Sequence, residues 1–474
     1  MRKAKLICTL GPATATPRAV RALVDAGMDV ARINFSHGTH DEHASALERV
    51  RAASGEAGRT VAALADLSGP KVRLGELSHH LHLEPGMRFV LRPDGPPGDE
   101  TGASTSHPGL GHDLRPGDRV LIADGVVELV VMEAGDEVVT EVVKALRKAR
   151  VAPHAGVNVP SERLSMPAVT EKDRADLAAV LDMGFDLVAQ SFVRSAADVQ
   201  ALRTLMGDRR VPIVAKIENR PAVEAAEDVA AAADAVMVAR GDLGVEIPLE
   251  EIPVTQKELI RVCRRAGTPS IVATQMMESM LGSASPTRAE VSDAANAVLD
   301  GADAVMLSGE TAIGAYPAEA AEAAATVVRV AEERGAPFRA PAPVSTVDDD
   351  GRAVAQAACA IARTGLEVSA IACFTRTGYT ARALAAARPD QPIIAFSSEP
   401  STVRTLALTW GVQPFLSDAP SDVDELIAMM DRRLVGDGLC GRGRTVVMVA
   451  AAPVGHAHTN LLKVHHLGDP AYRP

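Results

Sequence analysis

The feature that most constrains the fold of this chain is a regular alternation of strand-like and helix-like segments. Short apolar runs are each followed by a stretch of helical periodicity, and eight such units remain once one interruption is set aside. The strand-like runs are Lys5–Thr9, Val30–Phe35, Val61–Asp66, Leu187–Phe192, Val211–Ile217, Ala235–Ala239, Ser270–Thr274 and Ala304–Leu307. Eight strand–helix units predict an α/β fold of the (β/α)8 barrel type, with the chemistry at the carboxyl ends of the strands.

The alternation breaks between residues 71 and 155, where segments are short, rich in Gly and Pro, and alternate in polarity. This stretch predicts a small β domain inserted into the barrel. The barrel domain is therefore expected to comprise residues 1–70 and 156–338. After a linker rich in Ala and Pro, residues 345–474 alternate again and predict a separate C-terminal open α/β domain.

Composition excludes several classes of protein. The formal charge of -12 disfavours nucleic acid as a partner. The five cysteines are scattered without a CxxC pair, which predicts reduced thiols in a cytoplasmic protein and neither a disulfide scaffold nor a zinc site. No apolar run approaches the ~20 residues of a membrane helix, so no membrane association is expected.

The residues that follow the predicted strands are rich in charged and hydroxyl groups. Each has an ordinary structural explanation, such as a turn or a helix cap. Together they would gather many charges at one barrel mouth, which is costly unless ions or ligands pair with them. The charged and hydroxyl side chains concerned are Arg32, Asp66, Lys71, Arg73, Lys216, Glu218, Asp242 and Thr274.

Two carboxylates on adjacent strands, Glu218 and Asp242, suit Mg²⁺, which takes oxygen ligands and leaves positions for substrate oxygens. The backbone N–H groups of Gly241 and Asp242 precede an expected helical turn, and such donors favour a carboxylate or phosphate. These groups predict an anionic substrate held beside a divalent cation.

Basic residues complete this pattern. Lys216 shares a strand face with Glu218 and can lie against a transferring phosphoryl group. Arg32 and Arg73 add forked donors for phosphate oxygens. Because phosphoryl transfer depends on positioning and charge neutralisation, the residue types indicate that reaction.

Long motifs along the chain resemble the pyruvate kinase family. They are Ile7–Pro12 (ICTLGP), Arg32–Gly38 (RINFSHG), Ala215–Asn219 (AKIEN), Met237–Glu246 (MVARGDLGVE), Ala273–Met276 (ATQM), Pro286–Asp293 (PTRAEVSD) and Leu307–Thr311 (LSGET). The resemblance implies a β-barrel lid at residues 71–155 and a regulatory role for the C-terminal domain. It also implies a cytoplasmic homotetramer that makes pyruvate and ATP from phosphoenolpyruvate and ADP, the last step of glycolysis.

The resemblance also implies roles for individual residues. Lys216 would stabilise the transition state, and Glu218 and Asp242 would hold Mg²⁺, or Mn²⁺ in its place. Thr274 would lie near the face where the enolate is protonated, either directly or through water. The substrate contacts would be Arg32, Gly241, Asp242 and Thr274, and the nucleotide contacts Asn34, His37, Arg73 and Asp124.

The first departure from the family concerns K⁺. The family often binds this ion through residues that match Asn34, Ser36, Asp66 and the Leu67 carbonyl, and members that need it usually have Thr at position 67 and Glu at position 71. Here Leu67 and Lys71 stand at those positions. A fixed ammonium can replace the charge of the ion, so K⁺ is expected to be dispensable.

The loop Thr375–Thr380 lies between a predicted strand and a predicted helix, and two interpretations of it are open. The family places a phosphorylated effector here, and the side chains implied are those of Thr375, Thr377 and Thr380 beside Gly378. Hydroxyls and a Gly before a helix suit a phosphate, and they equally suit a capped turn.

Two other functions are compatible with parts of the sequence. A Mg²⁺-dependent lyase or aldolase would use Glu218 and Asp242, but it has no need of Arg32, Arg73 and a lid. A non-catalytic or weakly active metabolite sensor would have a damaged lid. Only Ala155 supports that reading, because the family usually has Lys at this position, where it reaches the nucleotide phosphates.

The substitution Ala155→Lys is expected to lower the KM for ADP, because it restores a cation beside the nucleotide phosphates. The measurement is initial rate against ADP concentration at saturating phosphoenolpyruvate. An unchanged KM would count against a lid role for this position.

Overall fold

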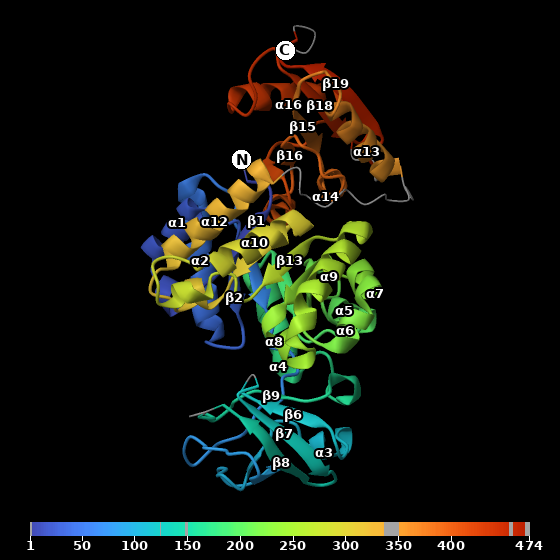
Figure 1. Cartoon of the computed structure of the whole chain (residues 1–474). Coiled ribbons are helices and arrows are strands. Elements are labelled where there is room, and N and C mark those ends of the chain that lie inside the picture. The colour runs from blue at the N-terminus through green and yellow to red at the C-terminus, as the bar shows by residue number, and fades with distance from the viewer. Residues whose placement is uncertain (1, 124, 147–149, 336–349, 455–457, 470–474) are drawn as a thin grey trace.

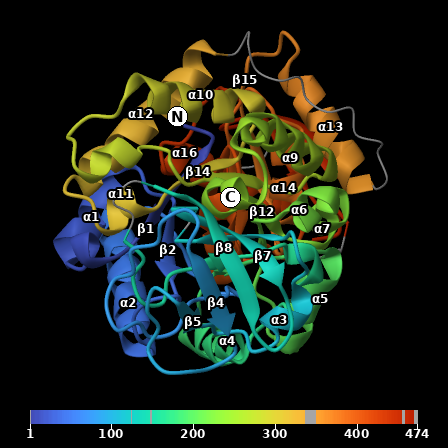
Figure 2. The same cartoon turned by 60° about the horizontal axis from the view of Figure 1, so that its bottom comes forward.

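The chain forms three parts arranged along one axis, with the inserted domain at one end, the barrel in the middle and the C-terminal domain at the other end (Figure 1). The computed structural model describes residues 2–123, 125–146, 150–335, 350–454 and 458–469. The inserted domain, called the lid below, stands in front of the barrel when that end is brought forward (Figure 2).

The predicted (β/α)8 barrel is confirmed. Eight parallel strands close in the order β1-β14-β13-β12-β11-β10-β3-β2, and nearly all of their residues are buried. Their bounds are β1 Lys5–Thr9, β2 Val30–Asn34, β3 Ala62–Asp66, β10 Leu187–Gln190, β11 Ile213–Ile217, β12 Ala235–Ala239, β13 Ser270–Ala273 and β14 Ala304–Leu307.

Helices cover the outside of the barrel. Three of them begin with a Thr that exchanges hydrogen bonds with an acidic residue three positions later, which satisfies the free N–H groups of the first turn. These pairs are Thr39 with Glu42, Thr170 with Asp173 and Thr287 with Glu290. The helices are α1 Pro17–Ala26, α2 His40–Ala57, α4 Glu171–Met183, α5 Ala196–Leu205, α6 Arg220–Glu224, α7 Ala226–Ala232, α8 Arg240–Glu246, α9 Ile252–Ala266, α10 Arg288–Asp300, α11 Gly309–Ala312 and α12 Pro317–Arg334.

The lid is a curled six-stranded sheet in the order β5-β4-β8-β7-β6-β9 around its own apolar core. The short strands β5 and β9 have no counterpart in the sequence analysis, since two or three residues carry too little periodicity to detect. The lid elements are β4 Arg88–Arg92, β5 Gly102–Ser104, α3 Leu110–Asp113, β6 Arg119–Ile122, β7 Val127–Glu133, β8 Val138–Ala145 and β9 Val157–Asn158.

The C-terminal domain is the expected open α/β domain, with strand order β17-β16-β15-β18-β19 and only β19 antiparallel. Sequence analysis missed the edge strand β17, whose central Pro414 lowers the strand signal and is tolerated because the strand lies at an edge. The elements are α13 Asp350–Ala362, β15 Val368–Phe374, α14 Tyr379–Ala386, β16 Ile393–Ser397, α15 Pro400–Thr405, β17 Val412–Leu416, α16 Val423–Gly436, β18 Thr445–Ala450 and β19 Leu461–His466.

Two expectations from composition can be compared with the structure. All five cysteines are free thiols, and four of them are buried. Among the described residues, no helix combines the length and apolar character that crossing a membrane requires.

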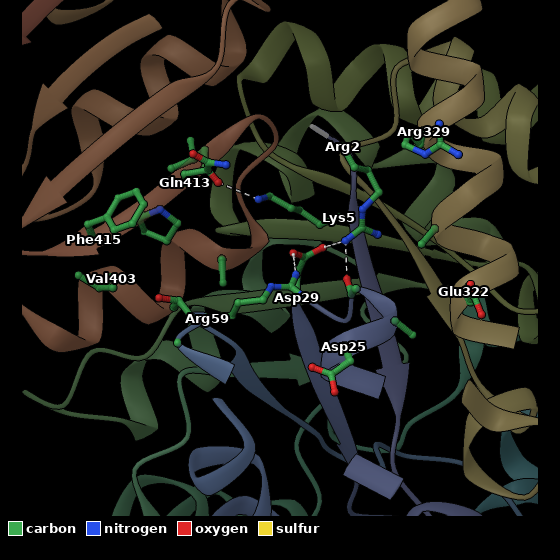
Figure 3. Close-up of a pocket in the computed structure, with 18 of the residues that line it drawn as sticks. Arg2, Lys5, Asp25, Asp29, Arg59, Glu322, Arg329, Val403, Gln413 and Phe415 are labelled. Carbon is green, nitrogen blue, oxygen red and sulfur yellow. Dashed lines mark hydrogen bonds and ion pairs between the residues drawn. The ribbon is translucent and has the colours of Figure 1, made fainter. Parts of the chain in front are cut away.

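The base of the barrel meets the C-terminal domain around a cavity of about 930 Å³, called the mixed-charge cavity below (Figure 3). The buried Lys5 ammonium donates a 2.8 Å hydrogen bond to the Val412 carbonyl of β17. Burial lowers the pKa of Lys5, although Asp29 opposes the shift. Arg2 forms an ion pair with Asp29. The junction is therefore polar, and these charged side chains have partners within the protein.

Asp186 forms a buried ionic contact between the barrel and the C-terminal domain. Its buried carboxylate accepts bonds of 2.6 and 2.9 Å from Arg51 on α2 and of 2.6 Å from Arg404 on α15. It also accepts a 2.7 Å bond from the backbone N–H of Ala63 in β3. One carboxylate thus holds two barrel elements and one C-terminal helix.

The substitution Asp186→Asn should destabilise the protein by roughly 3 kcal/mol, because it leaves two arginines facing a neutral group in a buried site. Asp182→Asn is the matched control, since Asp182 is exposed and pairs with Arg209 at the surface; its cost should stay below about 1 kcal/mol. Scanning calorimetry would compare the two variants, and equal melting temperatures would contradict this assignment.

Candidate active site

A buried ion network lies at the carboxyl ends of the barrel strands. Lys216, near the end of β11, places its ammonium 2.9 Å from Glu218 Oε1 and 3.3 Å from Asp66 Oδ1. It also donates a 2.7 Å hydrogen bond to the Ser191 hydroxyl. The predicted convergence of Lys216, Glu218 and Asp66 on one point is therefore present.

Arg32 on β2 extends the network. Its Nε donates to Asp66 Oδ2 at 2.6 Å, and its Nη1 donates to the Thr9 hydroxyl at 3.0 Å. Burial raises the pKa of Asp66, but Lys216 and Arg32 outweigh that effect and hold it below its ordinary value. Asp66 therefore stays ionised and fixes both cations.

The same balance keeps Lys216 charged. Burial lowers its pKa, whereas Asp66 and Glu218 raise it more strongly, so it lies above the ordinary value. The pKa of Glu218 is raised instead. Burial is the main cause, Lys216 lowers the pKa, and the nearby Asp242 raises it again. A second cation beside Glu218 and Asp242 would relieve this repulsion.

Asp242 lies in the first turn of α8, at the end of β12. Its Oδ1 accepts a 2.8 Å bond from Lys71, the residue that departs from the family pattern. The Lys71 ammonium also lies 5.9 Å from the centre of the Phe192 ring. The described network therefore pairs three cations, Arg32, Lys71 and Lys216, with three carboxylates, Asp66, Glu218 and Asp242.

Thr274 follows β13 in a left-handed conformation with φ 70°, which is uncommon for a β-branched residue. Its hydroxyl accepts a 2.9 Å bond from the Gly241 N–H and donates to the Ala273 carbonyl. Arg240 donates to the carbonyls of Ala273 and Thr274 and pairs with Asp293 at 2.6 Å. These contacts hold Thr274 and Gly241 together despite the strained backbone.

Three supporting residues were not singled out from sequence. Ser191 and Phe192 were placed inside the fourth strand, but β10 ends at Gln190 and both belong to its tip. Ser191 accepts from Lys216 and donates to the Leu67 carbonyl at 2.7 Å, and the Phe192 N–H donates to Glu218 Oε2 at 2.7 Å. The third is Arg240. Its position directly after a buried strand is the sequence feature that could have identified it.

Oxygen atoms that match the family's K⁺ site already have partners within the chain. Asn34 Oδ1 accepts a 3.0 Å bond from the Ser36 N–H, and the Leu67 carbonyl accepts from Ser191. Asp66 is engaged by Arg32 and Lys216.

The expected nucleotide contacts are less closely grouped. Arg73 Nη1 donates to the His154 carbonyl at 3.1 Å, and its backbone N–H donates to Ser106, so its described contacts lie in the lid. His37 is exposed, and its carbonyl accepts from His43. Asp124 lies outside the described residues.

The loop Thr375–Thr380 forms a capped turn. The Thr375 hydroxyl accepts from the Gly378 N–H at 3.0 Å, and the Thr380 hydroxyl pairs with Thr459 at 2.6 Å. Thr377 remains exposed. The hydroxyls of Thr375 and Thr380 therefore already form hydrogen bonds within the domain.

Metal binding can be assessed from the donor set. Among the residues that the structure describes, no three or more His, Cys, Asp or Glu side chains gather as a metal cluster. Glu218 and Asp242 supply two carboxylates that repel each other, and the Asp242 side chain is 28% exposed. Such a pair fits Mg²⁺, which needs few protein oxygens when substrate and water complete its shell.

The barrel, the inserted lid and the cation held between carboxylates define a phosphotransferase of the (β/α)8 class. Comparison with known families agrees, because residues 1–321 match the pyruvate kinase barrel domain and residues 352–465 match the pyruvate kinase alpha/beta domain. The chain belongs to the pyruvate kinase family.

Individual relatives cover nearly the whole chain. The sequence is 44% identical to a pyruvate kinase of Mycobacterium tuberculosis (strain CDC 1551 / Oshkosh) over 99% of both chains. It is 41% identical to a pyruvate kinase of Geobacillus stearothermophilus over 99% of this chain and 81% of that one. A crystal structure of a pyruvate kinase from Cryptosporidium parvum superimposes with a TM-score of 0.89 at 34% identity, covering 98% of this chain and 96% of that chain.

Glu246 ends α8 and joins the barrel to the chain returning from the lid, because it accepts a 2.9 Å hydrogen bond from Ser161. The pKa of Glu246 is raised to about 7. Burial is the main cause and Glu162 adds to it, whereas the hydrogen bond from Ser161 lowers the pKa and opposes them. The folded protein therefore binds this proton more tightly than the unfolded chain does.

Protonated Glu246 should contribute its whole stabilising free energy below pH 4.5, the ordinary pKa of the group. This contribution should be lost as the pH rises through about 7, its pKa in the folded protein. Glu246→Gln should remove this part of the pH dependence, because the amide does not titrate. Melting temperature measured across this pH range tests the effect, with the exposed Glu250→Gln as the neighbouring control. Parallel curves for wild type and Glu246→Gln would refute it.

Proposed function

We propose that the protein transfers the phosphoryl group of phosphoenolpyruvate to ADP, giving pyruvate and ATP as the last step of glycolysis. The observation that carries the proposal is the Lys216 ammonium, held between Asp66 and Glu218 at the barrel mouth. A fixed cation in a buried site stabilises charge that develops on a transferring phosphoryl group and on the departing enolate.

The substrate carboxylate is proposed to bind at the Gly241 and Asp242 N–H groups, at the start of α8. In binding, it would replace the Thr274 hydroxyl as the acceptor of the Gly241 N–H. This places the enolate close to Thr274, whose hydroxyl delivers a proton to carbon directly or through water. Arg32, fixed by Asp66, faces the phosphate and orients it.

Nucleotide binding is proposed to involve Asn34, His37, Arg73 and the lid residue Asp124. Arg73 supports this role because it is held by the His154 carbonyl, next to the position where the family usually carries Lys. Lid closure would bring Arg73 and Asp124 toward Asn34 and His37, which lie at and just after the end of the barrel strand β2, and would exclude water from the transfer.

Glu218 and Asp242 are proposed to hold Mg²⁺, with Mn²⁺ as a substitute. When bound, the ion neutralises the charge of the phosphoryl and nucleotide oxygens. Lys71 pairs with Asp242 and Lys216 pairs with Glu218, and these contacts hold the two carboxylates in place.

Regulation and assembly complete the proposal. A phosphorylated effector is assigned to Thr375, Thr377, Gly378 and Thr380, supported by the exposed Thr377 in a turn before α14. A cytoplasmic homotetramer is proposed from family membership.

Lys216→Met should lower kcat about a thousandfold, because it removes the cation that stabilises the developing negative charge. Pyruvate release from phosphoenolpyruvate with ADP and Mg²⁺ is the assay. Lys257→Met is the matched control, since Lys257 forms a surface pair with Asp300, and it should retain activity. If wild type shows no turnover even with candidate effectors, the metabolite-sensor alternative replaces this proposal. Formation of ATP along with pyruvate separates the phosphotransferase from the lyase alternative, which forms no ATP.

Potassium should not be required, because Lys71 supplies a fixed positive charge next to Asp242. Wild-type rates in K⁺ and in tetramethylammonium should be equal. Lys71→Glu places a second carboxylate near Asp242 and should make activity depend on K⁺. Many-fold activation of the wild type by K⁺ would overturn this expectation.

A further inference from the structure

A second cavity of about 750 Å³ lies between the barrel base and the C-terminal domain and is lined by residues of α9 and α14. Figures 1 and 2 show where these two helices lie. Its barrel wall is the end of α7 and the turn from α9 to β13, and its other wall is α13 and α14. We call it the arginine cavity, after the lining residues Arg264, Arg265, Arg352, Arg363 and Arg382.

The charge of this cavity is one-sided. Among the described residues that line it, Asp234 is the only carboxylate, and it accepts a 3.0 Å bond from Arg203 outside the cavity. Arg265 pairs with Glu227 at 2.6 Å. The mixed-charge cavity of Figure 3 differs, because acidic residues there offset the basic ones.

Three of the lining arginines from the C-terminal domain donate hydrogen bonds to backbone carbonyls. Arg352 donates to the Ala266 carbonyl at 3.2 Å, Arg363 to the Arg388 carbonyl at 3.0 Å and Arg382 to the Thr377 carbonyl at 3.2 Å. A carbonyl satisfies a donor but does not neutralise a guanidinium charge.

Burial makes this concentration of charge costly. It lowers the pKa of Arg382, although Asp234 opposes the shift, and burial together with Arg388 lowers the pKa of Arg264. Because both charged forms are disfavoured, a bound anion would relieve a real electrostatic cost.

We propose that the arginine cavity binds a metabolite carrying at least two phosphate groups, which bridges the barrel and the C-terminal domain. Arginine forks from both walls match phosphate oxygens, and the volume lies within the ~300–1,000 Å³ of small-molecule sites. The site is separate from the turn Thr375–Thr380 but touches it, since Arg382 bonds the Thr377 carbonyl. Any coupling between the two sites would be reciprocal, so each ligand would change the affinity for the other by the same factor.

Binding of inorganic pyrophosphate, measured by titration calorimetry without Mg²⁺, tests the proposal. Arg363→Gln should weaken binding about tenfold, the effect of losing one charge-assisted contact. Arg363→Lys should fall between this variant and wild type, because it keeps the charge and loses the fork. The matched control is Arg329→Gln in the mixed-charge cavity, which should bind as wild type does.

Controls separate this site from the other two candidate anion sites. Lys216→Met at the barrel mouth and Thr375→Val in the turn should still bind pyrophosphate. The proposal fails if Arg363→Gln binds as tightly as wild type, if wild type does not bind, or if Lys216→Met or Thr375→Val alone abolishes binding. Should Arg363→Gln not fold, Arg265→Gln probes the opposite wall with the same expected loss. The readout is binding, so it stands independently of catalysis.

Discussion

The contact of the Lys216 ammonium with Asp66 and Glu218 is the interaction on which the barrel mouth depends. Burying these ions separately would cost several kcal/mol each, so they are tolerable only as a matched set. Arg32 and Lys71 complete the set by pairing with Asp66 and Asp242. The residues that would act on substrate are thus the ones that make each other stable without it.

This mutual dependence also explains the strained backbone around the site. Phe192 and Thr274 both adopt positive φ values at strand tips, of 55° and 70°. The Phe192 conformation aims its N–H at Glu218, and that of Thr274 brings its hydroxyl to Gly241. Each strained residue therefore supplies a hydrogen bond that a relaxed strand end would direct elsewhere.

Sequence predicted the barrel well because its strands are short, buried and separated by helices with clear caps. It also predicted that Lys216, Glu218 and Asp66 converge, since parallel strands end at one face. It could not predict the pairing of Lys71 with Asp242, which lie 171 residues apart and meet through a loop whose path periodicity does not determine. The contacts of Arg73 with the lid were missed for the same reason. The role of Ser191 was missed because the predicted strand ran on to residue 192, whereas β10 ends at Gln190. Strand β17 was missed because Pro414 conceals it.

The short strand β10 connects the two ends of the barrel. Asp186, immediately before it, holds Arg404 of the C-terminal domain, and Ser191, immediately after it, holds Lys216. The four residues between them are buried and hydrogen bonded to β3 and β11 on either side. Arg404 on α15 and Lys216 at the barrel mouth therefore contact the two ends of one buried strand. The C-terminal domain is thus joined to the cation at the barrel mouth by an ion pair, the four residues of β10 and a hydrogen bond.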